Sequence, residues 1–179
     1  MGNPGAPRSA KLLHQVYGET KADVEKELVS VTFPGGKRVR VHRKVAPSLK
    51  QAMTEIQSEI DARKASSDTK LAEAMLQYFN SADCFNWRNI AGTNVRSTHS
   101  FGITCDLNPK ITHYWVWDEA AGVSWKDTNR TPALKKIILI LERYGFTSGV
   151  RWRHYDDMHF EYRPEYFASA CGTSNSTAF

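Results

Sequence analysis

The chain of 179 residues contains no long apolar run. A transmembrane helix needs an uninterrupted stretch of about 18 apolar residues, so no membrane span is expected. The first residues, MGNPGAP, lack the apolar centre of a secretory signal peptide. No internal repeat is visible either, and the length suits one domain with a core of its own.

Cysteine is scarce. The three cysteines, Cys84, Cys105 and Cys171, have no regular spacing. An odd number without a pattern excludes a disulfide framework and the spacing of a zinc finger. One disulfide is possible, and the sequence does not choose between the pairs.

Acidic residues are fewer than basic ones. The 19 Asp and Glu residues stand against 24 Lys and Arg, which gives a net charge of +5. Such a charge favours association with an anionic polymer. No helix-turn-helix signature or RNA-binding aromatic motif is present, so nucleic acid is not predicted as the partner. The anionic layers of a cell wall are the other polymer that this charge would favour.

Hydrophobic periodicity predicts a hairpin followed by helices. Residues 29–33 and 37–41 alternate with period two around a Pro-Gly-Gly turn, which is typical of a β-hairpin. Apolar residues at helical spacing predict helices over 47–65 and 71–79. A third helix is predicted over 132–144, because a threonine cap and a proline open it and a glycine ends it.

Short strands are predicted in two further places. Residues 103–107 follow a tight turn at Gly102 and are rich in β-branched residues. Because side chains alternate along a strand, Asp106 lies opposite the apolar face and points toward a cleft. Residues 150–155 also alternate like a strand, and 158–162 predict the returning strand after an Asp-Asp turn.

Two histidines and two aspartates near these strands have the chemistry of a metal site. A catalytic zinc site needs three protein ligands, an open position for water and a base beside it. His99, Asp106 and His159 can supply the ligands, and Asp156 can supply the base. Taken singly, such a histidine is more often a hydrogen-bonded or exposed residue, and such an aspartate is more often a cap or an ion-pair partner.

The two segments together resemble the zinc peptidases that cut peptidoglycan stem peptides, a family of D-alanyl-D-alanine carboxypeptidases, vancomycin-resistance dipeptidases and phage L-alanyl-D-glutamate endopeptidases. Residues 97–106 read STHSFGITCD and follow the family's Ser-x-His-x-x-Gly-x-Ala-x-Asp motif, with Thr104 in place of alanine. Residues 156–161 read DDMHFE and follow its second motif, an acidic residue three positions before a histidine, with the Phe-Glu continuation. The resemblance covers roughly residues 29–166.

The resemblance implies a role for each motif residue. His99, Asp106 and His159 would be the zinc ligands, and Asp156 would be the general base. The adjacent Asp157 is a rival for the role of base.

The residues around the motifs have possible roles too. Glu161 shares a strand face with the second histidine and could orient it. The resemblance implies that Arg88 contacts a carbonyl or carboxylate of the substrate and stabilises the oxyanion, and that Ser97 touches the substrate. The alternatives are a surface salt bridge for Arg88 and a hydroxyl that bonds its own loop for Ser97.

The chain also has an unusual concentration of aromatic residues in its second half. Aromatic side chains can line a cleft for sugar or peptide, but they bury large apolar areas and are more often core. We therefore expect core positions for most of them, with Trp152 near the site. The group consists of Tyr114, Trp115, Trp117, Trp125 and Trp152.

The expected fold is α+β, with a small antiparallel sheet, helices packed on one side and a zinc cleft at the strand ends, as in the hedgehog-like D,D-peptidases. Residues 1–28 are expected to be an N-terminal arm, 29–166 the peptidase domain and 167–179 a polar, mobile tail. A monomer is favoured.

The expected activity is zinc-assisted hydrolysis of an amide bond in a peptidoglycan stem peptide. The bond between L-Ala and D-Glu is favoured, because the His-Phe-Glu sequence and the compact length resemble the phage-type branch. A D-Ala-D-Ala carboxypeptidase is the second reading, followed by a non-catalytic zinc-binding wall module and a basic nucleic-acid-binding protein. The enzyme would act at the bacterial cell wall and be made without a signal peptide, like an endolysin, or have had its signal removed.

Overall fold

The computed structural model describes residues 9–124 and 130–167. Within these ranges the chain has the expected α+β fold, with six helices and two small antiparallel sheets. The helices are α1 (Ala10–Tyr17), α2 (Lys21–Lys26), α3 (Ala46–Ala65), α4 (Thr69–Gln77), α5 (Trp115–Ala120) and α6 (Pro132–Arg143). The strands are β1 (Leu28–Thr32), β2 (Arg38–His42), β3 (Thr104–Asp106), β4 (Phe146–Ser148) and β5 (His159–Tyr162).

Strands β1 and β2 form the hairpin that the alternation predicts. They pair antiparallel through a short 3₁₀ turn at Pro34–Gly36, in which Gly35 has a φ of 80° that favours glycine. Val31, Val39 and Val41 point into the core from this hairpin. The period of two therefore reflects one buried and one exposed face.

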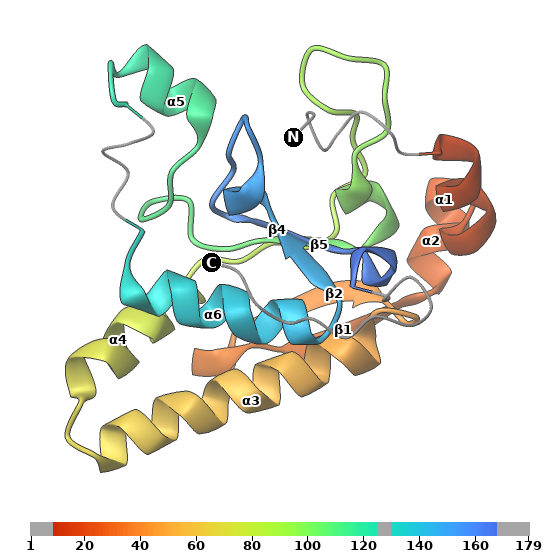
Figure 1. Ribbon diagram of the computed structural model, residues 1–179. Helices are drawn as coiled ribbons and strands as arrows, with labels where there is room; N and C mark the ends of the chain where they lie inside the picture. The colour runs from red at the N-terminus through yellow and green to blue at the C-terminus, as the bar shows by residue number, and fades with distance from the viewer. Residues whose placement is uncertain (1–8, 125–129, 168–179) are drawn as a thin grey trace, which may run out of the picture.

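The predicted helices over 47–65, 71–79 and 132–144 are confirmed as α3, α4 and α6. Thr131 caps α6 by accepting a hydrogen bond from Leu134 N, and Pro132 occupies its first position. The three helices contact one another and occupy the lower part of the molecule in Figure 1. Their apolar side chains supply nearly half of the buried core residues and pack beneath β1 and β4.

The second sheet has the order β3-β5-β4, with both pairs antiparallel. Its register places Asp106 opposite His159 and Thr104 opposite Glu161. Residues directly opposite in an antiparallel pair project to the same face. The strand pairing therefore brings the two sequence motifs together, although Asp106 and His159 lie 53 positions apart in the sequence.

The prediction of a strand over 150–155 is wrong. Besides β3, β5 pairs with β4, which follows α6 directly, and the chain after β4 forms a 3₁₀ turn at Gly149–Arg151. Backbone N–H groups of Trp152 and Asp156 both donate to Gly149 O, so the segment closes into a loop instead of continuing the ladder. The alternation of residues 151–154 reflects exposed arginines, not a strand face.

A disulfide joins Cys84 to Cys105. It connects the extended segment before residue 88 to β3, and both cysteines are buried. Cys105 thus points away from the cleft, as the alternation along β3 predicts. Cys171 lies outside the described residues.

The N-terminal helices α1 and α2 lie at the edge of the molecule beside the hairpin (Figure 1). Val24 is fully buried, and the ring of Tyr17 packs edge-on against His42. The domain boundaries at residues 28 and 166 stay predictions, and the predicted tail lies outside the described residues except for Phe167. None of the described helices is both long and apolar enough to cross a membrane.

Substitution of Gly102 tests how closely the hairpin packs against the first motif. Its φ is +63°, and a Cβ there would lie 2.8 Å from His42 N and 2.9 Å from Leu28 Cδ2. Gly102→Ala should lower the free energy of unfolding by about 2–5 kcal/mol, the left-handed strain plus the clash. The control is Gly35→Ala, which has a φ of +80° but nothing within 4 Å of its Cβ, and should cost only about 1–2 kcal/mol. Equal losses in urea unfolding would contradict this account.

Candidate metal centre

His99 lies in a short 3₁₀ turn, Thr98–Phe101, just before β3. The Gly102 N–H donates to His99 O at 3.0 Å and closes this turn. The His99 ring is buried, and its Nδ1 lies 2.9 Å from Cys84 O. A carbonyl oxygen only accepts, so Nδ1 carries the proton and Nε2 presents its lone pair.

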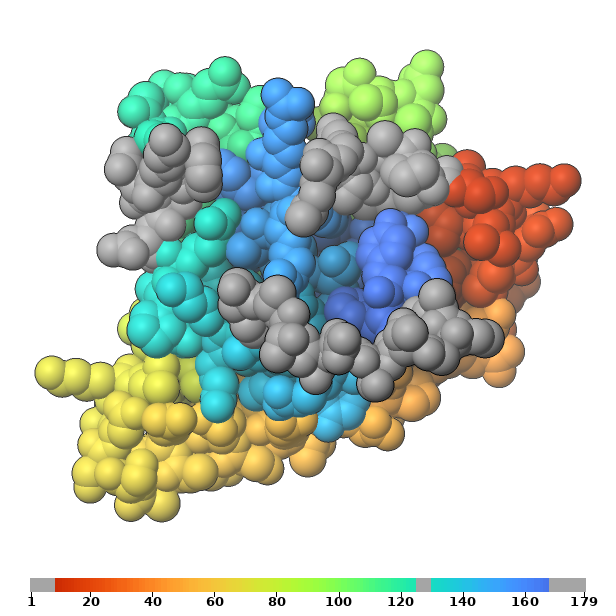
Figure 2. Space-filling model, in the orientation of Figure 1, coloured from red at the N-terminus to blue at the C-terminus, as the bar shows by residue number. Residues whose placement is uncertain are grey.

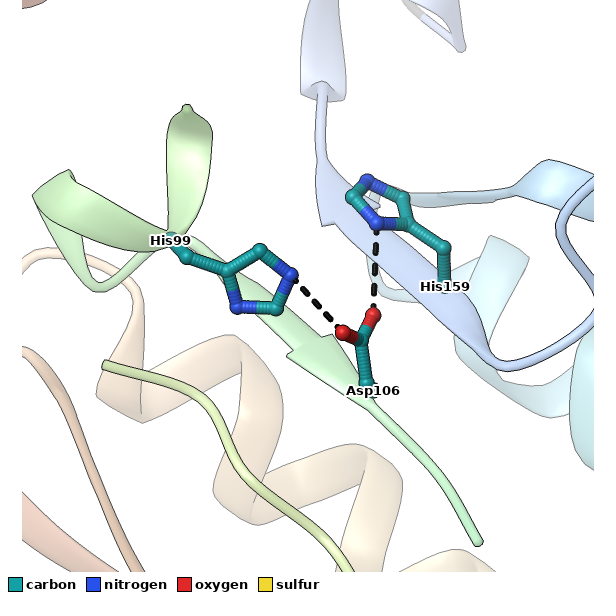
Figure 3. Close-up of side chains that lie close together, drawn as sticks. All are labelled: His99, Asp106 and His159. Atoms are coloured by element: carbon teal, nitrogen blue, oxygen red, sulfur yellow. Dashed lines mark ion pairs between the residues drawn. The ribbon is translucent and has the colours of Figure 1, made fainter. Parts of the chain in front are cut away.

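Asp106 stands between the two histidines. Its Oδ2 lies 3.1 Å from His99 Nε2, and its Oδ1 lies 3.3 Å from His159 Nδ1. Figure 3 shows the carboxylate with one oxygen turned to each ring. One ligand atom from each of the three residues lies within 4.8 Å of the others, so the group could hold a metal ion.

Glu161 lies behind His159, on the same face of β5. The Nε2 of His159 is 3.3 Å from Glu161 Oε2, which leaves Nδ1 facing Asp106. Glu161 is 1% exposed and also accepts hydrogen bonds from Thr98 Oγ1 and Arg163 Nη1. It is therefore placed to fix the tautomer and orientation of His159.

The donor atoms fit a zinc ion. Within the described part of the chain, Asp156 Oδ1 is buried and has no hydrogen-bond partner, whereas His99 Nε2 and Asp106 Oδ1 are buried and face only other members of the group. Buried polar atoms are nearly always paired, so such a group in one cavity indicates a ligand. Two imidazole nitrogens and one carboxylate, with one position left open, form a donor set typical of catalytic zinc.

The two carboxyl groups of the cavity differ in their pKa values. Burial raises the pKa of Asp106, but the hydrogen bonds and charges of His159 and His99 outweigh burial and hold it well below its usual range. Burial also raises the pKa of Asp156, to about 6; His159 opposes this rise and Asp106 adds to it. For His159 burial lowers the pKa, yet hydrogen bonds to Asp106 and Glu161 outweigh it and raise the value to about 9.

Asp156 is held by its backbone. Its N–H donates to Gly149 O at 3.1 Å, its carbonyl accepts from His159 N at 3.2 Å, and it forms a β-bridge with Tyr114. A Cβ on Gly149 would lie 2.2 Å from Asp156 O, so the two backbones touch. The sequence gives no sign of this role of Gly149, because the contact exists only once the loop has folded.

The structure separates the two adjacent aspartates. Asp156 lines the cavity with the three candidate ligands. Asp157 is fully buried outside that lining, where its Oδ1 lies 3.2 Å from Arg130 Nη2 and its N–H donates to His113 O. Of the two aspartates, only Asp156 lines the cavity that contains the three candidate ligands His99, Asp106 and His159.

The cavity measures about 690 Å³. Arg88 and Ser97 both line it. The Arg88 side chain is exposed, and no carboxylate among the described residues forms an ion pair with it. Ser97 Oγ accepts a hydrogen bond from His99 N at 3.4 Å. This contact is the hydrogen bond within its own loop that we gave as the alternative to a substrate contact. Their contact with substrate stays a prediction.

The expectation that most of the aromatic group lies in the core is wrong. Tyr114, Trp115, Trp117 and Trp152 line the cavity, and Trp117 is 51% exposed. The core is filled mainly by aliphatic and phenylalanine side chains instead. The short helix α5 contributes Trp115 and Trp117 to the cavity lining. Trp152 is near the site as expected, with its ring centroid 4.9 Å from that of His159. Trp125 lies outside the described residues.

Comparison with protein-family models gives a match. The family model described as D-alanyl-D-alanine carboxypeptidase matches residues 91–162. This segment contains the three candidate ligands and Asp156, and it begins after Arg88. Comparison with curated proteins gave no match.

The contact of Glu161 with His159 leads to a prediction on metal affinity. Glu161→Gln should weaken zinc binding by about 10- to 100-fold, because the histidine loses the carboxylate that orients it. Isothermal titration of the metal-free protein with zinc measures this. Glu165→Gln is the control, since Glu165 is exposed and also bonds Arg163. An unchanged zinc affinity in Glu161→Gln would show that the contact does not orient the ligand.

Proposed function

We propose that the chain hydrolyses peptidoglycan stem peptides with zinc held by His99, Asp106 and His159, because residues 91–162 match the family model described as D-alanyl-D-alanine carboxypeptidase. The observation that carries the proposal is the convergence of these residues in one cavity with the unpaired carboxylate of Asp156. The net charge of +5 supports action at the anionic bacterial cell wall.

Asp156 is the proposed general base. A bound zinc ion supplies Lewis acidity, which polarises the scissile carbonyl and makes water more acidic. Asp156 takes one proton from the attacking water as the water oxygen bonds to the carbonyl carbon. It then gives this proton to the amide nitrogen as the C–N bond breaks. A pKa of about 6, raised by burial, suits a carboxyl group that must both accept and return a proton near neutral pH.

Arg88 and Ser97 are the proposed substrate contacts. The Arg88 guanidinium is exposed on the lining of the cavity and can donate to a carbonyl oxygen or carboxylate of the stem peptide. Placed there, it also stabilises negative charge that develops on the carbonyl oxygen. Ser97 lies beside His99 in the same lining and positions the peptide backbone.

The proposed bond is the one between L-Ala and D-Glu. The sequence His-Phe-Glu at residues 159–161 supports it by resemblance to the phage endopeptidases. The cavity of about 690 Å³ lies within the usual size range of ligand-binding sites.

The second candidate is a D-Ala-D-Ala carboxypeptidase, which the description of the matched family favours. A non-catalytic zinc module is a weaker alternative, since such a module has no use for an unpaired Asp156 in the cavity. Mass spectrometry of fragments released from purified peptidoglycan by the zinc-loaded protein separates the three. A new D-Glu amino terminus supports the proposal, loss of one terminal D-Ala supports the second candidate, and no release contradicts both.

The role of Asp156 makes a prediction that separates catalysis from metal binding. Asp156→Asn should retain one zinc per chain and lose about 10²- to 10⁴-fold in kcat, the usual contribution of a general base. The assay measures peptide release and zinc content on the same sample. Asp61→Asn, the same change at an exposed position of α3, is the control and should keep wild-type activity. Turnover within a few-fold of wild type in Asp156→Asn would remove the residue from the mechanism.

The proposed ligand set predicts the behaviour of the metal. His159→Ala should lose bound zinc after dialysis, because two ligands remain where three are needed. Plasma emission spectroscopy measures the metal content. His14→Ala, which lies on α1, should keep its zinc. Chelation should abolish peptide release by the wild-type protein, and added zinc should restore it. A full zinc complement in His159→Ala would rule out its role as a ligand.

A further inference from the structure

An aromatic wall lines one side of the cavity. We define it by Tyr114, Trp115, Trp117 and Trp152, all of which contribute to the cavity lining. Figure 2 shows α5, which carries Trp115 and Trp117, as a projection at the top of the molecule, with the blue segment near residue 150 between it and the loop near residue 90. The proposed mechanism uses none of these four side chains.

The wall is fixed to the segment that carries Asp156. The Trp115 N–H donates to Tyr155 O at 3.0 Å, and Tyr114 forms a β-bridge with Asp156. Beneath α5, the buried carboxylate of Asp118 accepts a hydrogen bond of 2.6 Å from the Tyr155 hydroxyl. The rings are therefore held at a set position relative to the metal group, as a binding subsite requires.

The rings pack in a way that leaves aromatic surface open. Trp115 stacks one face on His154, with centroids 4.3 Å apart and planes at 22°. Tyr114 and Trp117 meet edge to face at 5.2 Å, and Trp117 remains 51% exposed. Large exposed aromatic side chains that line a cavity are typical of a binding site rather than of a stable core.

We propose that the aromatic wall binds an amino sugar of the glycan strand, so that the substrate is the glycan-linked stem peptide and not the free peptide. This inference rests on the proposed function. A pyranose ring has a face of C–H bonds, which stacks on the electron-rich face of an indole. Its hydroxyl and acetamido groups need polar partners, and Thr93 and His154 line the same cavity.

The position of the wall fits the chemistry of the proposed bond. In peptidoglycan the stem peptide begins with L-Ala, which is joined to the lactyl group of N-acetylmuramic acid. A chain extends by roughly 3.5 Å per residue, so the bond between L-Ala and D-Glu lies one residue from the sugar, and the bond between the terminal D-Ala residues roughly 14 Å away. The wall begins next to the metal group, since Trp152 packs on His159 and Tyr114 pairs with Asp156. A sugar one residue from the cleaved bond would therefore reach it.

The experiment compares two substrates that differ only in the sugar. One is a disaccharide-tetrapeptide released from peptidoglycan, and the other is the same tetrapeptide with an acetylated amino terminus. We expect kcat/KM for the disaccharide-peptide to exceed that for the free peptide by about tenfold, which corresponds to ~1.4 kcal/mol. The peptide-free disaccharide should also inhibit hydrolysis of the free peptide competitively.

Variants assign the preference to the wall. Trp117→Ala should bring the ratio of the two kcat/KM values close to one, whereas Trp117→Phe should keep most of it because an aromatic face remains. Val116→Ala is the matched control, since Val116 is an exposed neighbour on α5 that does not line the cavity. It should keep the wild-type ratio. Circular dichroism verifies that each variant is folded.

The outcomes separate this inference from the proposed function. Hydrolysis of both substrates at the L-Ala–D-Glu bond with equal kcat/KM would overturn the sugar subsite and leave the proposed function standing. A preference that survives in Trp117→Ala would place the sugar elsewhere and overturn the role of the wall. If the protein cuts neither substrate, the proposed function itself fails, and the inference with it.

Discussion

The pairing of Asp106 with His159 across β3 and β5 is the contact on which the site depends. Residues opposite each other in an antiparallel pair share a face, so a one-residue slip would turn one of them away. The disulfide holds β3 to the segment of Cys84, whose carbonyl fixes the tautomer of His99. Sheet register, disulfide and histidine tautomer thus specify one arrangement of three donor atoms.

The electrostatics of the cavity follow from what surrounds each carboxyl group. Asp106 lies between two imidazoles, and they keep it ionised in spite of burial. Asp156 is half-buried, and its buried Oδ1 has no hydrogen-bond partner, so desolvation dominates and its pKa rises. Two carboxylates in one cavity are thereby prepared for different tasks, one to hold a cation and the other to exchange a proton.

Much of this arrangement could be predicted from the sequence, because it depends on local patterns. The hairpin, α3 and α6 follow from periodicity, caps and turn residues, and the convergence of the two motifs follows from spacing shared with known peptidases. The loop after β4 and the aromatic wall could not be predicted. The alternation of apolar and polar residues over 150–155 is compatible with a strand and with an exposed loop, so it does not distinguish between them. Trp115 and Trp117 are large aromatic residues of the kind that usually fill a core. Only the tertiary structure shows that α5 stands beside the cleft.

The close contact of Gly149 with Asp156 limits how this site can diverge. A side chain at position 149 would displace the carbonyl oxygen of Asp156, whatever peptide or sugar the enzyme accepts. Among descendants of this sequence, the walls of the cavity can change with the substrate, but this glycine should persist wherever the acidic residue keeps its place. A substitution at both positions, in contrast, would mark a lineage in which the fold and the metal site have been put to another use.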